Sequence, residues 1–326
     1  MIRCLTFIIA PEDAGATIRD FLRSRGFSQR MIVRLREGGS IQVDGIPAIT
    51  PRRLSAGETL EIQLKEEESS EKIPPRPLPF PVVYEDADLL VINKPAGMPI
   101  HPSQGNHENT LANAAAWYFA EKKEPFVFRV INRLDRDTTG LLILARHSLS
   151  ACMLSDMAAR REIHREYLAA AAGMVPEALR IDAPIGRVPG SAIKRQVDFQ
   201  EGDMAVTHCR RLLYRPDLDA SLVQLKLETG RTHQIRVHMS HIGHPLYGDF
   251  LYNPDFAHLA RRDSLLGTGE ENPAAMCEEN PAAMNRQALH SFRLCFRHPL
   301  TGQELSFTAP LPPDMQWILP EGMSFP

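Results

Sequence analysis

The pattern of apolar and polar positions predicts a chain built from short helices and strands. Residues 89–92 and 141–145 are apolar throughout and of strand length, so we expect two buried strands. Residues 221–228 alternate between apolar and polar side chains, which predicts a strand with one exposed face. A further strand is expected at 165–172, and helices are expected at 111–119, at 149–161 and from about residue 232.

The first 64 residues have the pattern of a small separate unit. Residues 17–25 and 28–37 are amphipathic and predict two helices, which Gly26 separates. Ser28 is a suitable N-cap for the second helix. The Asp44-Gly45 pair lies between two short runs and predicts a β-hairpin, and residues 59–64 supply a last strand.

Changes in composition mark the boundaries that follow. Residues 65–80 contain an acidic, serine-containing run and then four prolines, a composition that buries no core and predicts a stiffened linker. Residues 81–320 are expected to form one larger domain. Within it, residues 253–285 contain the sequence ENPAAM twice, and two such short copies predict an exposed acidic insertion rather than a solenoid.

The overall composition is that of an ordinary globular protein. The 326 residues are 43% hydrophobic and 24% charged, and no apolar run approaches the length of a membrane span. The five cysteines are scattered, which predicts reduced thiols and a cytoplasmic location. The apolar N-terminal run is short and lacks a small-residue cleavage site, so we expect a strand there and no signal peptide.

Charge is distributed unevenly along the chain. The net charge of −3 carries no global signature of a nucleic-acid binder, yet the two N-terminal helices are strongly basic. They carry Arg19, Arg23, Arg25, Arg30, Arg34 and Arg36 against Asp20 and Glu37. This clustering is consistent with an RNA-binding surface and also with a solvated basic face.

One acidic residue stands out in the middle of the chain. Asp135 lies between Arg133 and Arg136, in the sequence RVINRLDRDTTGLLILAR, on a loop that leads into the buried strand 141–145. Two flanking guanidinium groups are expected to keep the carboxylate ionised and in place. A structural salt bridge at a turn explains the same arrangement, so the rest of the chain has to decide.

Two resemblances add to this picture. The run DFLRSRGFSQRMIVRLREGGSIQVDG resembles the alpha-L RNA-binding domain of a ribosomal protein and of many RNA-modifying enzymes. The region from about 80 to 320 resembles an RluA-type pseudouridine synthase in four stretches, in the order of that family. They are YEDADLLVINKPAGMPIHP, INRLDRDTTGLLILAR, REYLA and LETGRTHQIRVHMSHIGHPLYGD. The resemblance implies an α+β catalytic domain with a central, mostly antiparallel sheet.

The second resemblance also implies a reaction and roles for individual residues. A uracil is cut from its ribose, turned and rejoined through carbon five, and Asp135 matches the catalytic carboxylate. Tyr167 matches an active-site tyrosine; without the motif, a core tyrosine in a strand would be the favoured interpretation. Arg231 matches an arginine that pairs with the catalytic aspartate. Arg133 matches a side chain that fills the space of the flipped base, and Leu227 is expected to pack on the uracil.

The sequence departs from the family pattern at two positions. Asn132 stands where histidine is frequent, and Arg165 stands where lysine is frequent. Both departures are expected to be tolerated, because neither replaces the carboxylate. Arg19, Arg23, Arg30 and Arg34 are the N-terminal residues expected to contact RNA.

Several other residues allow more than one interpretation. Lys94, in the turn NKPAG, is either a phosphate contact or the cap of a strand end. Four histidines at 233, 238, 241 and 244 suggest zinc, but no cysteine accompanies them and the implied chemistry uses no metal. No Gly-rich nucleotide fingerprint is present, so we expect no cofactor. A hydrolase that uses Asp135 together with a histidine is a further alternative. It is disfavoured because the histidines lie outside the Asp135 stretch and the sequence shows no nucleophile elbow.

The expected protein is therefore a monomeric, cofactor-free pseudouridine synthase. Its expected substrate is 23S ribosomal RNA, with transfer RNA as the alternative. The rival from another class is a non-catalytic RNA-binding or ribosome-assembly factor, which would be favoured by the loss of Asp135 or Tyr167; both are present. The sequence leaves open whether the aspartate attacks the base or the sugar, or first triggers loss of a ribose proton.

Overall fold

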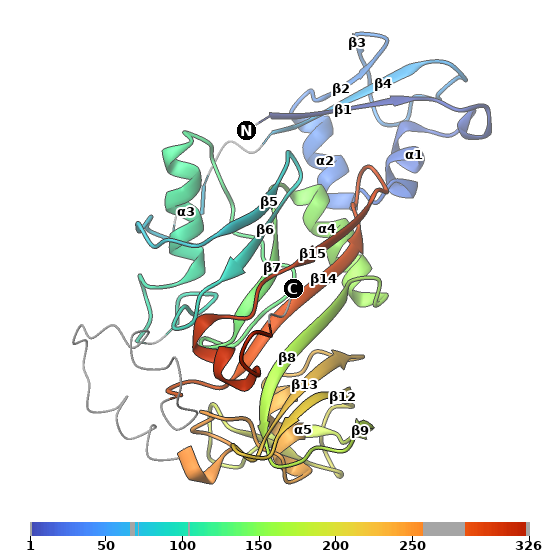
Figure 1. The fold of residues 1–326 in the computed structure, drawn as a ribbon. Coiled ribbons are helices and arrows are strands. Elements are labelled where there is room, and N and C mark those ends of the chain that lie inside the picture. The colour runs from blue at the N-terminus through green and yellow to red at the C-terminus, as the bar shows by residue number, and fades with distance from the viewer. Residues whose placement is uncertain (1, 66–68, 71, 104, 257–283, 324–326) are drawn as a thin grey trace.

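The computed structural model describes residues 2–65, 69–70, 72–103, 105–256 and 284–323. The fold is α+β, and the predicted fold class is confirmed. A small four-stranded sheet precedes a large nine-stranded sheet (Figure 1). Within the described residues, no helix has the length and apolar content to cross a membrane.

The N-terminal lobe, residues 2–65, contains the predicted helices and hairpin. Its elements are β1 (Ile2–Ile8), α1 (Ile18–Ser24), α2 (Gln29–Glu37), β2 (Ile41–Val43), β3 (Ile46–Pro47) and β4 (Thr59–Lys65), in the sheet order β1-β4-β2-β3. The Ser28 hydroxyl caps α2 by accepting the Met31 backbone N–H at 3.3 Å. Asp44 and Gly45 take φ values of 50° and 76°, which a tight two-residue hairpin requires.

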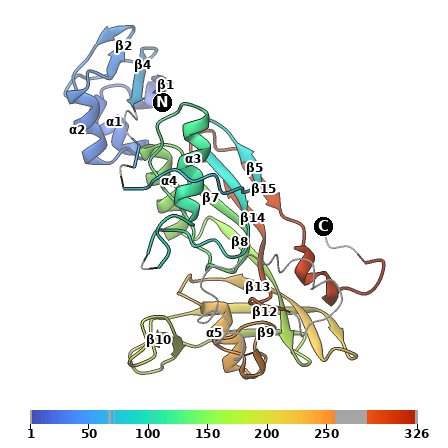
Figure 2. The ribbon, with the colours of Figure 1, turned by 90° about the vertical axis from the view of Figure 1, so that its left-hand side faces the viewer.

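This lobe is anchored to the rest of the protein by an apolar contact and an ion pair. Its core cluster, which includes Phe21 and Leu22, also contains Leu149 of helix α4 (Ser148–Ala159). On the other side, Arg3 Nε lies 2.7 Å from Asp88 Oδ1. The lobe sits at the end of the molecule away from helix α5 (Gln234–His241) (Figure 2). The six arginines of α1, α2 and the turn between them are exposed, and their RNA contacts stay a prediction.

The large sheet is antiparallel except where β7 and β14 run parallel. Its order is β5-β6-β7-β14-β8-β13-β12-β9, and β15 pairs with β14. The strands are β5 (Val82–Glu85), β6 (Leu89–Lys94), β7 (Thr139–Ala145), β8 (His164–Ala172), β9 (Ala178–Asp182), β12 (Val206–Arg215), β13 (Ala220–Leu227), β14 (Leu289–Arg297) and β15 (Glu304–Thr308). A separate hairpin joins β10 (Ile185–Arg187) to β11 (Arg195–Val197).

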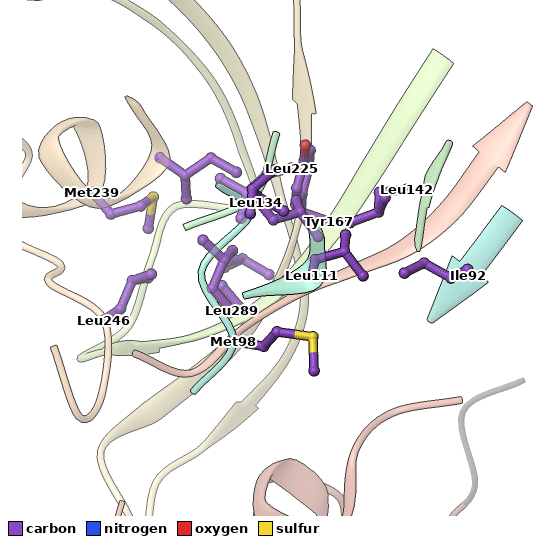
Figure 3. Close-up of a cluster of buried hydrophobic side chains, with 14 of the residues drawn as sticks. Ile92, Met98, Leu111, Leu134, Leu142, Tyr167, Leu225, Met239, Leu246 and Leu289 are labelled. Atoms are coloured by element: carbon purple, nitrogen blue, oxygen red, sulfur yellow. The ribbon is translucent and has the colours of Figure 1, made fainter. Parts of the chain in front are cut away.

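Residues 141–145 of strand β7 are apolar throughout because both faces of the sheet are covered at this point. Leu142 and Leu144 belong to the cluster that contains helix α3 (Leu111–Glu121), whereas Leu141 and Ile143 belong to the cluster that contains α4. Figure 3 shows the first of these clusters, with Leu142 near Tyr167 and Leu111. The prediction of a buried strand at 141–145 is confirmed.

Gly140, at the start of β7, allows two strands to approach closely. Its φ is 111°, and a Cβ placed there would lie 2.2 Å from the Ser291 carbonyl oxygen of β14. No L side chain fits this position, so glycine is required where the Asp135 loop enters the sheet.

The alternation in residues 221–228 predicted a half-exposed strand, which is confirmed for the second half of β13 and wrong for the first half. Leu222 and Val223 point to opposite faces, yet both are buried and belong to different core clusters. Further along the strand Gln224 is half-buried and Lys226 is exposed, so the predicted exposed face is present only in this second half. Strands β9 and β12 and the β10–β11 hairpin were not predicted, since their sequences mix apolar and charged residues without a clear period.

The described part of the linker 65–80 is held against helix α3 and the residues that follow it. Ser69 and Ser70 accept the backbone N–H groups of Phe126 and Phe128, each at 3.1 Å. The Asn113 side chain of α3 donates to the Pro74 carbonyl oxygen at 2.9 Å. The predicted insertion at 253–285 falls largely outside the described residues, which omit 257–283.

Candidate active site

A cleft of about 710 Å³ opens where the loop before β7 meets β8, β13 and the start of α5. The five residues predicted for the catalytic region all line it. They are Arg133, Asp135, Tyr167, Leu227 and Arg231. Segments up to about a hundred residues apart in the sequence therefore converge on one hollow.

A buried lysine, Lys94, fixes the position of the Asp135 loop. Lys94 is fully buried, and its Nζ donates to the carbonyl oxygens of Pro95, Met98 and Arg136 at 2.7, 3.1 and 2.7 Å. All three N–H groups of an ammonium are thus occupied. Lys94 ties the end of β6 to the Asp135 loop, so the structure favours the strand-end reading over the phosphate contact.

The Asp135 carboxylate is paired with Arg236, in the first turn of α5. Arg236 Nη1 lies 3.1 Å from Asp135 Oδ2, while its Nε and Nη2 donate to Asp249 at 2.7 and 2.8 Å. The Arg236 and Asp249 side chains are 4% and 0% exposed, against 25% for Asp135. One buried guanidinium therefore bridges a buried carboxylate and a carboxylate open to the cleft.

Charge and burial act in opposite directions on this arginine. Burial on its own lowers the pKa of Arg236, but the hydrogen bonds and negative charges of Asp249 and Asp135 outweigh it and raise the pKa above its ordinary value. Arg236 is therefore a permanent cation aimed at Asp135.

The prediction that Arg231 pairs with Asp135 is wrong. Arg231 precedes α5 and is exposed; its Nε donates to the Met204 carbonyl oxygen at 3.1 Å, and its Nη1 lies 3.7 Å from Asp203. The flanking Arg136 does not take this place either, because it pairs with Asp137 at 3.0 Å. The side chain that meets Asp135 comes from the same sequence motif, five residues later.

The reason lies in the backbone just before α5. His233 has a left-handed conformation with a φ of 57°, which is rare for a residue other than glycine and turns the chain sharply into the helix. Gln234 is buried, and its side chain accepts from the Thr229 hydroxyl and the Arg231 backbone N–H at 2.8 and 2.9 Å. This turn leaves Arg231 outside and directs Arg236 into the protein.

The wall of the cleft is apolar beside the carboxylate. Tyr167 of β8 pairs in register with Leu225 of β13, and Leu227 follows two positions later on the same face. Figure 3 shows Tyr167 beside Leu134 and Leu225. Burial raises the pKa of the Tyr167 hydroxyl, so the side chain is a neutral phenol at neutral pH. This wall suits the flat face of a base.

The rim of the cleft is basic. Arg133 is exposed at its edge, and Arg165 lines it from β8. A neighbouring hollow shares Arg133 and Arg231 with the cleft and adds Arg187 and Arg195 from the β10–β11 hairpin. Guanidinium groups around a partly apolar pocket fit a phosphate-bearing ligand with an unstacked base.

The histidines that suggested zinc are used in other ways. Both ring nitrogens of His238 have partners, the Thr207 hydroxyl at 2.8 Å and the Ala183 carbonyl oxygen at 2.9 Å. In the described part of the chain, the one group with metal-ligand spacing is Asp86, Asp88 and His298. It lies at the junction with the N-terminal lobe, and Arg3 already neutralises Asp88.

Comparison with known proteins agrees with this geometry. The profile of the family described as RNA pseudouridylate synthase matches residues 88–241. An RNA pseudouridine synthase of Bacillus subtilis (strain 168), named YjbO and described as uncharacterized, is 35% identical over 305 residues, which cover 93% of this chain and 98% of that protein. The chain belongs to the RNA pseudouridylate synthase family.

Other relatives of this synthase show the same likeness. The ribosomal large subunit pseudouridine synthase D of Vibrio vulnificus (strain CMCP6) is 38% identical over 280 residues, or 85% of this chain and 81% of the relative. The structure of human RNA pseudouridylate synthase domain containing 1 covers 73% of the synthase and 85% of its own chain, with 25% identity and a TM-score of 0.53. The synthase is thus an isomerase that acts on RNA, as the resemblance implied.

Proposed function

We propose that this synthase converts uridines of 23S ribosomal RNA to pseudouridine and that Asp135 is its catalytic carboxylate. The observation that carries the proposal is the array of Asp135, Arg236 and Asp249. It presents a carboxylate, held by a buried arginine, to a cleft with an apolar wall and a basic rim. The ribosomal target is supported by relatives named ribosomal large subunit pseudouridine synthase D. Modification of ribosomal RNA by this enzyme would take place in the cytoplasm.

The reaction is an isomerisation of one nucleoside: a carbon-bound hydrogen passes to solvent, a nitrogen gains a proton, and no atom is lost overall. The bond between C1′ of the ribose and N1 of the uracil breaks, the uracil turns, and a bond forms between C1′ and C5. The hydrogen on C5 leaves as a proton, and N1 ends with one proton. Asp135 acts at the junction of sugar and base, as a nucleophile or by stabilising the charge that develops there.

The other residues of the cleft receive complementary roles. The target base must leave the helical stack, which costs a few kcal/mol, and the exposed Arg133 is placed to fill the vacated space. Tyr167 and Leu227 cover the uracil face. Because burial raises the pKa of Tyr167, we assign its ring a stacking role and do not assign it to the removal of the C5 proton as a phenolate.

Tritium release tests the assignment directly. RNA transcripts carrying uridine labelled with tritium at C5 are incubated with the enzyme, with 23S ribosomal RNA and a transfer-RNA mixture in separate reactions. Wild type should release tritium from 23S ribosomal RNA. Release from transfer RNA alone would overturn the ribosomal target, and release from neither would overturn the activity.

The catalytic assignment is tested by two matched variants. Asp135→Asn keeps an oxygen that accepts from Arg236 but removes the charge, so tritium release should fall below detection while RNA affinity and thermal stability change little. Asp137→Asn removes a carboxylate two residues along the same loop, which pairs with Arg136, and should retain activity within a few-fold. Turnover by Asp135→Asn would remove Asp135 from its role.

A further inference from the structure

Tyr252 connects three parts of the protein beside the active-site cleft. Its hydroxyl oxygen lies 2.8 Å from the backbone N of Arg195 in the β10–β11 hairpin and 2.8 Å from Nδ1 of His233. The face of its ring covers the guanidinium of Arg236, 5.1 Å from the ring centroid. Tyr252 is buried and therefore touches both side chains that approach Asp135.

The hydrogen bonds of the Tyr252 hydroxyl determine which ring nitrogen of His233 is protonated. The Arg195 N–H can only donate, so the Tyr252 oxygen accepts there and retains one proton to give. Among the described residues, His233 Nδ1 is the acceptor in reach of that proton. Nδ1 thus carries the lone pair, and the ring proton of the neutral imidazole is on Nε2.

The protonated nitrogen is the one that faces the carboxylate. His233 Nε2 lies 3.9 Å from Asp135 Oδ2, on the open side of the ion pair with Arg236. Burial lowers the pKa of His233, so at neutral pH the ring is uncharged and its tautomer decides what it presents to Asp135. In the other tautomer a lone pair would face the carboxylate and repel it.

We propose that Tyr252 is a positioning residue for catalysis: its hydroxyl holds His233 in the Nε2–H tautomer, which turns an N–H toward the Asp135 carboxylate. The inference rests on the proposed role of Asp135. At 3.9 Å the contact is longer than a hydrogen bond, and such contacts shorten when a substrate fills the site. The left-handed backbone at His233 holds the ring where both of its nitrogens meet these partners.

Removing the hydroxyl alone tests the proposal. Tyr252→Phe should lower kcat by about ten- to a hundred-fold, the loss expected when a catalytic group is misplaced by up to 1 Å, and leave KM nearly unchanged. Tyr247→Phe is the matched control, because Tyr247 lies in the same segment and its hydroxyl donates to the Leu218 carbonyl oxygen away from the cleft. It should keep the wild-type kcat.

Variants of His233 separate positioning from general destabilisation. In His233→Gln the amide nitrogen can take the place of Nε2 and carries only donor protons, so most of kcat should remain, whereas His233→Leu should lose it. Because leucine has no ring nitrogen for the hydroxyl to orient, Tyr252→Phe should cost little further kcat when added to His233→Leu. An equal loss of kcat from Tyr252→Phe in wild type and in His233→Leu would overturn the proposal.

A spectroscopic measurement completes the test without relying on turnover. The ¹⁵N shifts of the His233 ring, assigned by their absence in His233→Gln, should show a bare Nδ1 in wild type and a shift toward Nδ1–H in Tyr252→Phe. An Nδ1–H tautomer in wild type, or a Tyr252→Phe enzyme with unchanged kcat, would refute the role of the hydroxyl. If Asp135→Asn proved active instead, the proposed function would fail while the tautomer result would stand.

Discussion

Replacing Arg236 by methionine separates the two duties of the buried ion pair. Arg236 neutralises Asp249 inside the protein and aims Asp135 at the cleft. Methionine has a similar length and fills the space without a charge. The substitution leaves Asp249 fully buried, with the backbone N–H of Leu251, at 3.1 Å, as a remaining donor. The substitution should therefore lower the free energy of unfolding as well as kcat.

The structure sets the magnitude of both losses. Removing one partner of a buried, hydrogen-bonded ion pair costs about 3–5 kcal/mol, a large part of the ~5–15 kcal/mol that holds a typical protein folded. For a chain of 326 residues that is a fall in Tm of roughly 4–7 °C. Loss of the donor to Asp135 should lower kcat by a factor on the order of 10²–10³.

A second substitution makes the reasoning refutable. In the double variant Arg236→Met and Asp249→Asn the buried charge is gone, and asparagine still offers an oxygen to the Leu251 N–H. Urea unfolding should show that the double variant regains about 2 kcal/mol or more relative to Arg236→Met. Tritium release should stay low in both. A double variant as unstable as the single one, or one with restored kcat, would contradict the proposed division of duties.

Two further predictions concern pH and salt. The ring of His290 accepts from the Thr139 hydroxyl. Burial lowers the pKa of His290 from 6.5 to about 4. Between these two pH values the unfolded chain therefore binds a proton at His290 that the folded protein does not bind. The stability advantage of wild type over His290→Gln should therefore be full above pH 6.5 and shrink by up to about 1.4 kcal/mol per pH unit as the pH falls toward 4; a constant difference in urea unfolding would contradict this. Neutralising four exposed arginines of α1 and α2 should reduce the slope of log affinity for RNA against log salt by about 3, from four charges at roughly 0.7–0.9 each. The four are Arg19, Arg23, Arg30 and Arg34. Arg297→Gln, whose arginine pairs with Glu304, should leave the slope unchanged; an unchanged slope in the fourfold variant would remove these arginines from the RNA surface.

The elements whose pattern is local were predicted well. The two N-terminal helices, the Asp44-Gly45 hairpin and the buried strand at 141–145 all follow from spacing, capping and turn chemistry within about ten residues. Strand β13 shows what such local rules do not predict. Its alternating pattern predicts a half-exposed strand, and Lys226 is exposed as expected, but Leu222 and Val223 are buried on opposite faces because elements distant in the sequence cover both faces there.

The same distinction applies to the site. The sequence by itself determined that Asp135, Tyr167 and Leu227 belong to one cleft, because they match a motif set in the order of a known family. The partner of Asp135 was decided only by the tertiary structure. Arg236 meets it across 101 residues, and the choice between Arg231 and Arg236 depends on the left-handed turn at His233. A sequence motif states which side chains are available, whereas the direction in which each one points is set by the backbone and by the surfaces packed around it.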